Sequence, residues 1–307
     1  MASMDVFNSN AFSLTSLTSV VNLLDYNPSY LGEMNIFDSK PVQSQNIFVD
    51  RRDGFLTLIP SSPTGAPPDE LTRDDRDAIS LRTTRLTRGF SVYATEVQNV
   101  RAFNGETEFE RVQVEFARRM ERVRQDMEYT HENHRLAAIQ GRLIDADGTT
   151  ELYNYYNTFG ETEAPAVPFN LATATTDVRG VCAEIIRSMA RSARGSFTPQ
   201  TKVHALVGDA FFDALVVHPQ VRETYLNYQA AAALRDGSAF GDLDYGGIMF
   251  HNYRGSDDNS TVAVGANDAF FFPVGARDVF TKAMAPHESI EYANTPGLDM
   301  YLSLIHI

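Results

Sequence analysis

Two histidines near position 130 are the first side chains in the sequence whose spacing could support chemistry. His131 and His134 enclose Glu132 and Asn133 in the run HENH. Histidines three positions apart share one face of a helix, where both could bind a zinc ion. The run is one residue shorter than the H-E-x-x-H pattern of zinc-binding helices. We therefore expect a solvated stretch near the end of a helix, with a metal-ligand pair as the minor alternative.

Four aspartates in the last quarter of the chain could offer carboxylates to a calcium ion or to a hydrolytic site. They are Asp242, Asp244, Asp257 and Asp258. No EF-hand spacing follows them, and no glutamate closes a loop of the kind that holds calcium. We interpret them as turn and loop residues. The alternative is a hydrolase whose site is assembled from distant carboxylates such as Asp242 and Asp244.

The other reactive side chains lack a catalytic context. Cys182 falls on the apolar stripe of a predicted helix, where a buried thiol is unreactive. The seven histidines are scattered, and no Ser/His/Asp grouping follows from their spacing. The chain contains no G-x-x-x-x-G-K-[ST] phosphate loop, no G-x-G-x-x-G after a strand and no G-x-S-x-G elbow. We predict no catalytic, cofactor-binding or metal site, which favours an assembling protein over an enzyme.

A long helix from about residue 106 to residue 140 is the element around which the others are arranged. Oppositely charged residues four apart, such as Glu115 and Arg119, flank its apolar stripe, and Gly141 stands where a helix would end. At about 1.5 Å per residue the helix would be roughly 50 Å long. It is either a solvated coiled-coil segment or a spine that carries flanking domains. The apolar stripe consists of Phe109, Val112, Phe116, Met120, Val123 and Met127.

The segments before this helix predict an arm and a projecting hairpin. Residues 1 to about 45 are rich in Asn, Ser and Thr and predict an extended arm, or alternatively a frayed terminus. The alternation typical of strands runs from residue 47 to residue 59 and again from 79 to 87, on both sides of the proline-rich tip Pro60–Pro68. A hairpin of two strands has little core of its own, so we expect it to lie on another surface. We expect the aromatic residues of the arm to lie on a neighbouring copy of the chain. They are Phe7, Phe12, Tyr26, Tyr30 and Phe37.

The second half predicts a compact α+β domain of short helices and strands. It follows a hairpin turned by Asp145 to Gly148 and a linker at residues 161–170. Helices are predicted from the cap Thr176 to Gly195, from the cap Asp209, and from Pro219 to Arg235. The arginine face of the first of these helices predicts a solvated surface, with an interface or a contact to enclosed nucleic acid as the minor alternative. The predicted strands are Leu152–Tyr156, Lys202–Val207, Ile248–Tyr253, Thr261–Val264 and Ala269–Phe272.

Length, charge and cysteine content bound the function further. The 307 residues suggest about two domains, and the chain contains no apolar run of 18 residues and no signal peptide. A single cysteine fits a reducing cytoplasm. The net charge of −14 disfavours binding of nucleic acid through its phosphates, although enclosing it needs no affinity. Five arginines between Arg73 and Arg88 contrast with this acidity and suggest contacts between copies of the chain.

Short fragments spread over nearly the whole chain occur in the order and spacing of one known family. They are Met4-Asp5-Val6-Phe7-Asn8, Ala11 to Thr15, Asp53 to Pro60, Gly65-Ala66-Pro67, Leu143 to Gly148, Gly246-Gly247-Ile248, Tyr253-Arg254-Gly255, Phe272-Pro273, Ala285-Pro286, Glu291 to Gly297 and Tyr301. In these residues the chain resembles the major capsid protein of lambda-like tailed phages, the phage major capsid protein E family.

The resemblance implies the α+β fold of tailed-phage major capsid proteins, in five parts. In the family the chain runs on for several tens of residues after the segment that ends here at Tyr301, so we expect the last part to be truncated. The parts are an N-terminal arm (1–45), an E-loop hairpin (46–100), a P-domain with a spine helix and a β-sheet (101–165), an axial A-domain (166–285) and a segment returning to the P-domain (286–307).

The resemblance also implies a structural function without catalysis. Copies of the chain would assemble as pentamers and hexamers into the icosahedral head that encloses the double-stranded DNA of a tailed bacteriophage. Decoration, scaffold and portal proteins would be partners, DNA would be enclosed without sequence-specific binding, and no membrane would be involved. The chain would be found in the virion after assembly in the host cytoplasm. The alternatives are a phage-derived nanocompartment shell, the hydrolase described above and, more weakly, a binding module on a host surface.

Overall fold

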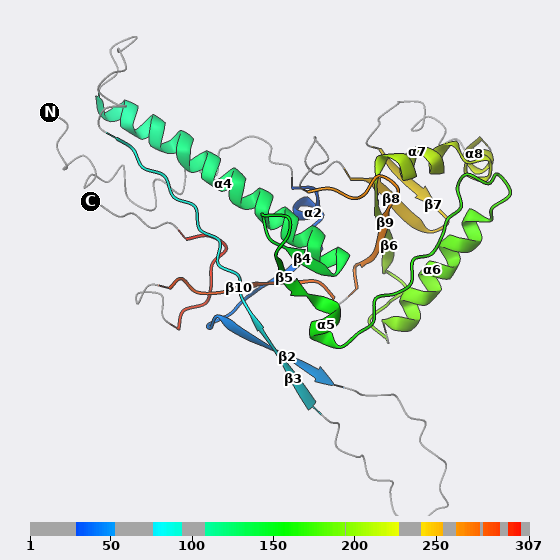
Figure 1. Cartoon of the computed structure of the whole chain (residues 1–307), viewed down its shortest axis with the longest axis horizontal. Helices are drawn as coiled ribbons and strands as arrows, with labels where there is room; N and C mark the ends of the chain where they lie inside the picture. The colour runs from blue at the N-terminus through cyan, green and yellow to red at the C-terminus, as the bar shows by residue number, and fades with distance from the viewer. Residues whose placement is uncertain are drawn as a thin grey trace, which may run out of the picture. The chain divides into compact units, whose positions relative to one another are not determined.

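The computed structural model describes residues 29–52, 76–93, 108–193, 195–226, 241–253, 262–276, 279–288 and 294–301 (Figure 1). Helices and strands are mixed along these residues, so the predicted α+β class is confirmed. The chain divides into two compact units. The larger unit takes residues 29–38 and the described parts of Leu86–Asn157 and Glu161–Thr281, and the smaller unit takes the described parts of Ser39–Arg85, Thr158–Gly160 and Lys282–Ile307.

The long helix predicted near residues 106–140 is α4, which runs from Glu108 to Gln140 without a break (Figure 1). It ends at Gly141, whose φ of +84° lies in the left-handed region that glycine adopts without strain. A Cβ atom at this position would lie 2.4 Å from the ring of Tyr156, so the close packing of that ring also requires glycine. The predicted pair forms, because Nε of Arg119 lies 2.7 Å from Oε1 of Glu115.

A four-stranded sheet forms the middle layer of the larger unit. Its strands lie in the order β7 (Asp242–Tyr245), β8 (Ile248–Asn252), β6 (Lys202–Val207) and β9 (Ala269–Val274). Only the β6–β8 pair is parallel. The prediction of β6, β8 and β9 is confirmed. The strand predicted at Thr261–Val264 is wrong, because the described residues 262–264 join no strand.

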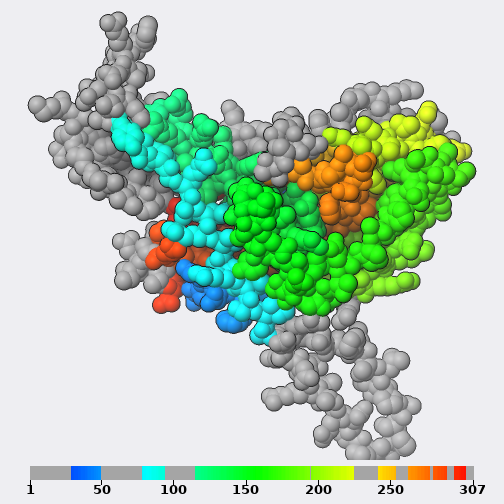
Figure 2. Space-filling model, viewed as in Figure 1, coloured from blue at the N-terminus to red at the C-terminus, as the bar shows by residue number. Residues whose placement is uncertain are grey.

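Helices α6 (Val178–Ser192), α7 (Asp209–Val217) and α8 (Pro219–Leu226) pack on one face of this sheet (Figure 1). In the space-filling view, residues 262–276 in orange lie beside α7 and α8 in yellow-green, where the backbone N–H of Phe211 donates to the Ala266 carbonyl over 2.9 Å (Figure 2). The core of this face includes Val178, Cys182, Ile185, Val203, Ala205, Val207, Phe211, Phe212, Leu215, Leu243, Tyr245, Ile248 and Phe250.

The start of α6 differs from the prediction in its capping residue. Asp177 caps the helix, since its Oδ1 accepts a hydrogen bond from the backbone N–H of Gly180 over 3.0 Å. Thr176 instead donates its hydroxyl to the carbonyl of Asn170 over 3.0 Å. Two capping residue types stand side by side here, and pattern alone does not tell which one faces the helix end.

The opposite face of the sheet is covered by α2 (Tyr30–Glu33) and the last turns of α4. Leu31 is fully buried there, and the ring of Phe37 packs 5.2 Å from that of Phe280. Tyr30 and Phe37 were predicted to seek a partner surface outside the chain, and that expectation is wrong for both, because their partners lie in the same unit. This second core comprises Leu31, Leu136, Leu206, Tyr253, Val262, Val264 and Phe272.

The predicted hairpin after α4 is confirmed as β4 (Arg142–Ile144) paired with β5 (Glu151–Asn154). Asp147 shapes the turn by accepting bonds from the hydroxyl of Thr150 and from the backbone N–H groups of Thr149 and Thr150, which lower the pKa of its carboxyl. The strand predicted to reach Tyr156 stops earlier, because Tyr155 already begins the short helix α5 (Tyr155–Phe159).

The smaller unit consists of two ribbons of two strands each. In one, β1 (Asp38–Pro41) pairs with β10 (Thr281–Met284), and neither strand was predicted. In the other, β2 (Asn46–Arg52) pairs antiparallel with β3 (Arg76–Arg82), which confirms the predicted hairpin over these residues. The predicted proline-rich tip lies outside the described residues.

A buried carboxylate joins α2, α4 and the sheet. Glu132 of α4 is 2% exposed, and its Oε1 accepts hydrogen bonds from the backbone N–H of Leu31 over 2.7 Å and from the hydroxyl of Tyr253 over 3.2 Å. Its Oε2 accepts from the backbone N–H of Gly32 and from Arg135, each over 3.2 Å. Because α2 is a single turn, this carboxylate supplies the acceptors that its first N–H groups cannot find within the helix.

We predict that Glu132→Gln lowers the free energy of unfolding by about 2 kcal/mol, because an amide cannot accept all four bonds and the guanidinium of Arg135 loses its nearest carboxylate. Glu121→Gln on the same helix is the matched control, since Glu121 accepts a hydrogen bond from Gln125 over 3.4 Å, and it should cost less than about 0.5 kcal/mol. Denaturant unfolding of the unassembled chain measures both values. Equal midpoints and slopes for the two variants would contradict the role assigned to Glu132.

Candidate functional site

The β2–β3 ribbon presents apolar side chains on both of its faces. Phe48 is 68% exposed and Val49 is 36% exposed, and neighbouring residues of a strand point to opposite faces. The register sets Phe48 opposite Ser80 and Val49 opposite Ile79 without a bulge. A two-stranded ribbon without a covered face is marginally stable in water. The ribbon is therefore the described element with most to gain from burial against a second surface.

The base of this ribbon is fastened by polar contacts. The backbone N–H of Thr83 donates to the carbonyl of Gln45 over 2.9 Å, and Nε of Arg85 lies 3.1 Å from Oε1 of Glu288. Both side chains of this ion pair are at least half exposed, so the pair adds little stability. Arg85 thus has a carboxylate within its own unit, whereas we expected an acidic surface on another copy. Arg73 lies outside the described residues.

The segment that follows, residues 86–93, lies along α4. Nε of Arg88 is 3.0 Å from Oδ2 of Asp126, and the ring of Phe90 packs 5.2 Å from the ring of Phe116. Arg119 also donates to the carbonyl of Ser91. These contacts hold an extended segment on the helix, although it forms no strand.

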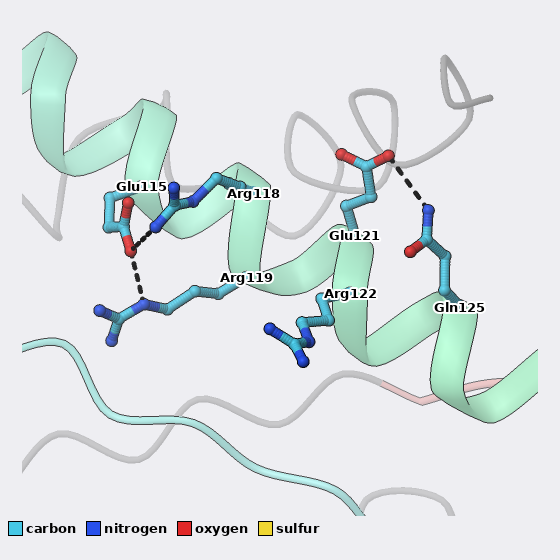
Figure 3. Close-up of a pocket in the computed structure, with 6 residues that line it drawn as sticks. All are labelled: Glu115, Arg118, Arg119, Glu121, Arg122 and Gln125. Carbon is cyan, nitrogen blue, oxygen red and sulfur yellow. Dashed lines mark hydrogen bonds and ion pairs between the residues drawn. The ribbon is translucent and has the colours of Figure 1, made fainter.

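A shallow, charged depression marks the exposed face of α4 (Figure 3). Glu115 accepts hydrogen bonds from Arg119 and Arg118, which lower the pKa of its carboxyl against the opposing effect of burial. Because acids and bases there pair with one another, the surface suits a polar protein contact better than an ion of one sign. The lining residues are Glu115, Arg118, Arg119, Glu121, Arg122 and Gln125.

The HENH run is only partly solvated. The rings of His131 and His134 meet edge to face with centroids 6.4 Å apart, and burial lowers the pKa of His134. Glu132 between them is buried, so the expectation of a solvated stretch is wrong for this residue. Within the part of the chain that the structure describes, no group of three or more His, Cys, Asp or Glu side chains could hold a metal ion.

Asp242 and Asp244 lie on strand β7, so their interpretation as turn and loop residues is wrong. Aspartate is rare in strands, so residue propensity disfavours a strand over Asp242, Leu243, Asp244 and Tyr245 despite their alternation. Leu243 and Tyr245 face the core, and the two aspartates are exposed on the other face. Asp257 and Asp258 lie outside the described residues.

Asp242 belongs to a group of four polar side chains that we call the histidine cluster: Tyr30, His204, Asp242 and His251. Nδ1 of His251 is 2.6 Å from Oδ1 of Asp242 and 2.6 Å from the hydroxyl of Tyr30. Nε2 of His251 is 2.8 Å from Nδ1 of His204. Burial, followed by the charge of Asp242, raises the pKa of Tyr30, so its hydroxyl stays protonated and is no nucleophile.

The remaining candidates are placed as follows. Cys182 is fully buried, which confirms its predicted place on the apolar stripe, and burial raises the pKa of its thiol to about 12, which disfavours the nucleophilic thiolate. Arg179, Arg187 and Arg191 of α6 are exposed, in agreement with a solvated face. None of the helices that the structure describes combines the length and the apolar character that crossing a membrane requires.

Glu132 and the histidine cluster were not found from the sequence as partners of α2. Residues 100 to 221 positions apart in the chain meet there, so no local pattern indicates them. The parallel pairing of β6 with β8 brings His204 and His251 together, and only a correct sheet topology would have predicted it. Phe48 is different, because an aromatic residue on a predicted two-stranded hairpin is a visible signal of a docking surface.

Comparison with known proteins agrees with the resemblance noted in the sequence. The family model described as phage major capsid protein E matches residues 13–305. The major capsid protein of Salmonella phage Felix O1 (isolate Felix O1-VT1) is 26% identical over 324 aligned residues, which cover 95% of this chain and 87% of that protein. Since the family match spans nearly the whole sequence, the chain belongs to the phage major capsid protein E family.

Proposed function

We propose that this chain assembles as pentamers and hexamers into the icosahedral head that encloses the double-stranded DNA of a tailed bacteriophage. Membership of a capsid protein family supports the class of function. The observation that carries the mechanism is the β2–β3 ribbon, whose Phe48 is 68% exposed. An element with apolar residues on both faces and no core of its own is suited to lie on an adjacent copy of the chain.

The proposed mechanism is geometric. Ordering a thin projection costs conformational entropy in the free chain, and burial against a neighbour offsets that cost only in the assembled shell. Complete burial of a phenylalanine side chain contributes about 2 kcal/mol. The same contact repeats in every copy, so a small gain per subunit becomes decisive for the lattice.

The five parts of the family fold are part of this proposal. We assign the N-terminal arm to residues 1–45, the E-loop to 46–100, the P-domain to 101–165, the A-domain to 166–285 and the return segment to 286–307. The length of helix α4 supports the assignment of the P-domain spine. The sheet β7-β8-β6-β9, packed against α6 and α7, supports the assignment of the A-domain.

Decoration, scaffold and portal proteins are the proposed partners besides further copies of the chain. DNA would be enclosed without sequence-specific contacts, in keeping with a net charge of −14. The chain would assemble in the host cytoplasm and remain in the virion.

A phage-derived nanocompartment shell is the closest alternative, and the neighbouring genes separate the two. Terminase and portal genes would support a phage head, whereas an adjacent gene for a cargo enzyme would support a nanocompartment. A hydrolase whose site is assembled from distant carboxylates such as Asp242 and Asp244 is the alternative from a different class of function. Particle imaging combined with a measurement of bound metal separates a shell from such an enzyme.

We predict that Phe48→Ser leaves the free chain folded but strongly reduces particle formation, because the exposed ring contributes only when a neighbour covers it. Val217→Ser is the matched control, since Val217 is 65% exposed at the end of α7. Circular dichroism checks the fold, and gradient sedimentation with electron microscopy counts particles. Normal particle yields from Phe48→Ser, or equal losses in both variants, would argue against docking through the ribbon.

We also predict that changing Arg82, Arg85 and Arg88 together to Glu gives a soluble, folded chain that no longer assembles. The reversal removes the basic surface and places like charges beside Glu288 and Asp126. Exposed ion pairs contribute at most about 1 kcal/mol each, so the fold should survive. The control reverses three exposed arginines of α6, at positions 179, 187 and 191, and should still form particles. Sedimentation of wild-type-like particles from the first variant would contradict the prediction.

A further inference from the structure

The histidine cluster joins α2 to the sheet through side chains from four elements. Tyr30 comes from α2, His204 from β6, Asp242 from β7 and His251 from β8. His251 stands in the middle and is 4% exposed. The Asp242 side chain is 56% exposed, so solvent protons can reach the cluster.

The number of protons that this arrangement can hold is limited by its geometry. The Asp242 carboxylate accepts the Nδ1 proton of His251, which leaves Nε2 of His251 facing Nδ1 of His204 over 2.8 Å. One proton fits between these two nitrogens. If both rings were fully protonated, two N–H groups would point at each other and the bond would be lost. The pair of rings can therefore carry one positive charge, but two charges separate it. Because Nδ1 of the same His251 ring lies 2.6 Å from the hydroxyl of Tyr30, a displacement of this ring also breaks the contact with α2.

The groups around the two histidine rings also disfavour a second positive charge. Tyr30 faces the rings from α2, Lys202 from β6 and Asp242 from β7, and on the β9 side the apolar ring of Phe272 lies 6.1 Å from His204. Burial lowers the pKa of His204 to about 4, and the charges of His251 and Lys202 act in the same direction while Asp242 opposes them. The free imidazole titrates near 6.5, at about the reference value.

We propose that the histidine cluster is a proton-sensitive attachment, which holds the Tyr30 end of α2 on the sheet and loosens when both histidines are protonated. This goes beyond the assembly function and is a property of the single chain. Loosening concerns the Tyr30 end of α2, since the Glu132 contacts and the buried Leu31 hold its other side.

The direction of the pH effect follows from linkage. The attached state binds fewer protons than the loosened state between the free pKa of His204, about 6.5, and its lowered value of about 4. The attachment is therefore complete above about pH 6.5 and is lost as the pH falls through that window. One proton is taken up per opening, so the opening constant should rise by roughly tenfold per pH unit.

Hydrogen exchange measured by mass spectrometry on the full, unassembled chain tests the proposal. Peptides covering residues 29–36 should lose protection by roughly tenfold per pH unit between pH 6.5 and 4, after correction for the intrinsic rate of amide exchange. In His204→Asn this slope should flatten, because an amide can present either its NH₂ or its oxygen to His251 and takes up no proton. Any slope that remains in the variant belongs to groups outside the cluster.

His134→Asn is the matched control, since burial also lowers the pKa of His134 but the residue lies outside the cluster. It should keep the wild-type slope. An unchanged slope in His204→Asn, or no loss of protection in the wild type, would overturn the proposal. Imidazole NMR titration of the wild type gives an independent answer if the variant fails to fold. A His204 resonance that titrates near pH 6.5 would overturn it as well.

Discussion

The structure of the larger unit depends on one buried carboxylate. Glu132 accepts hydrogen bonds from α2, from Arg135 of its own helix and from Tyr253 at the end of β8. A carboxylate removed from water is costly unless all its acceptor positions are used, and here they are. Because its partners come from three elements, the bonds can form only when α2, α4 and the sheet are in place together. The carboxylate thus makes the arrangement specific, while the apolar cores on the two faces of the sheet supply most of the stability.

The two units differ in how much of their apolar surface is buried within the single chain. The sheet of the larger unit is covered on both faces, with Leu206 and Phe250 completely buried on opposite sides. The smaller unit consists of ribbons in which Phe48 remains in water. Under the proposed assembly, such a subunit would leave this element in water until an adjacent copy covers it, so its apolar side chains would contribute to stability only in the shell.

Local patterns predicted the parts of this fold that are determined by neighbouring residues. The extent of α4 followed from its charged pairs and from Gly141, and β6 followed from its apolar run. Elements stabilised by distant partners were missed: α2 is too short to form without Glu132, and β7 carries aspartates that disfavour a strand. The histidine cluster was out of reach for the same reason, because its members come from four elements. The exposed ribbon was predictable, since a hairpin of two strands has no core of its own, whatever the rest of the fold is.

Arg85 and Arg88 already hold carboxylates within the free chain, at Glu288 and Asp126. Contact with an acidic group on another copy would therefore exchange one partner for another, with no net gain of an ion pair. Exchanges of this kind change the free energy little, and dissolved salt screens the ion pair within the chain and the ion pair between copies alike. Contacts that change the free energy so little can break and form again. Under the proposed assembly, a misplaced subunit could therefore leave a growing lattice before its apolar side chains are buried. The paired arginines would then act as a proofreading step, in which correct fit is tested before binding becomes permanent.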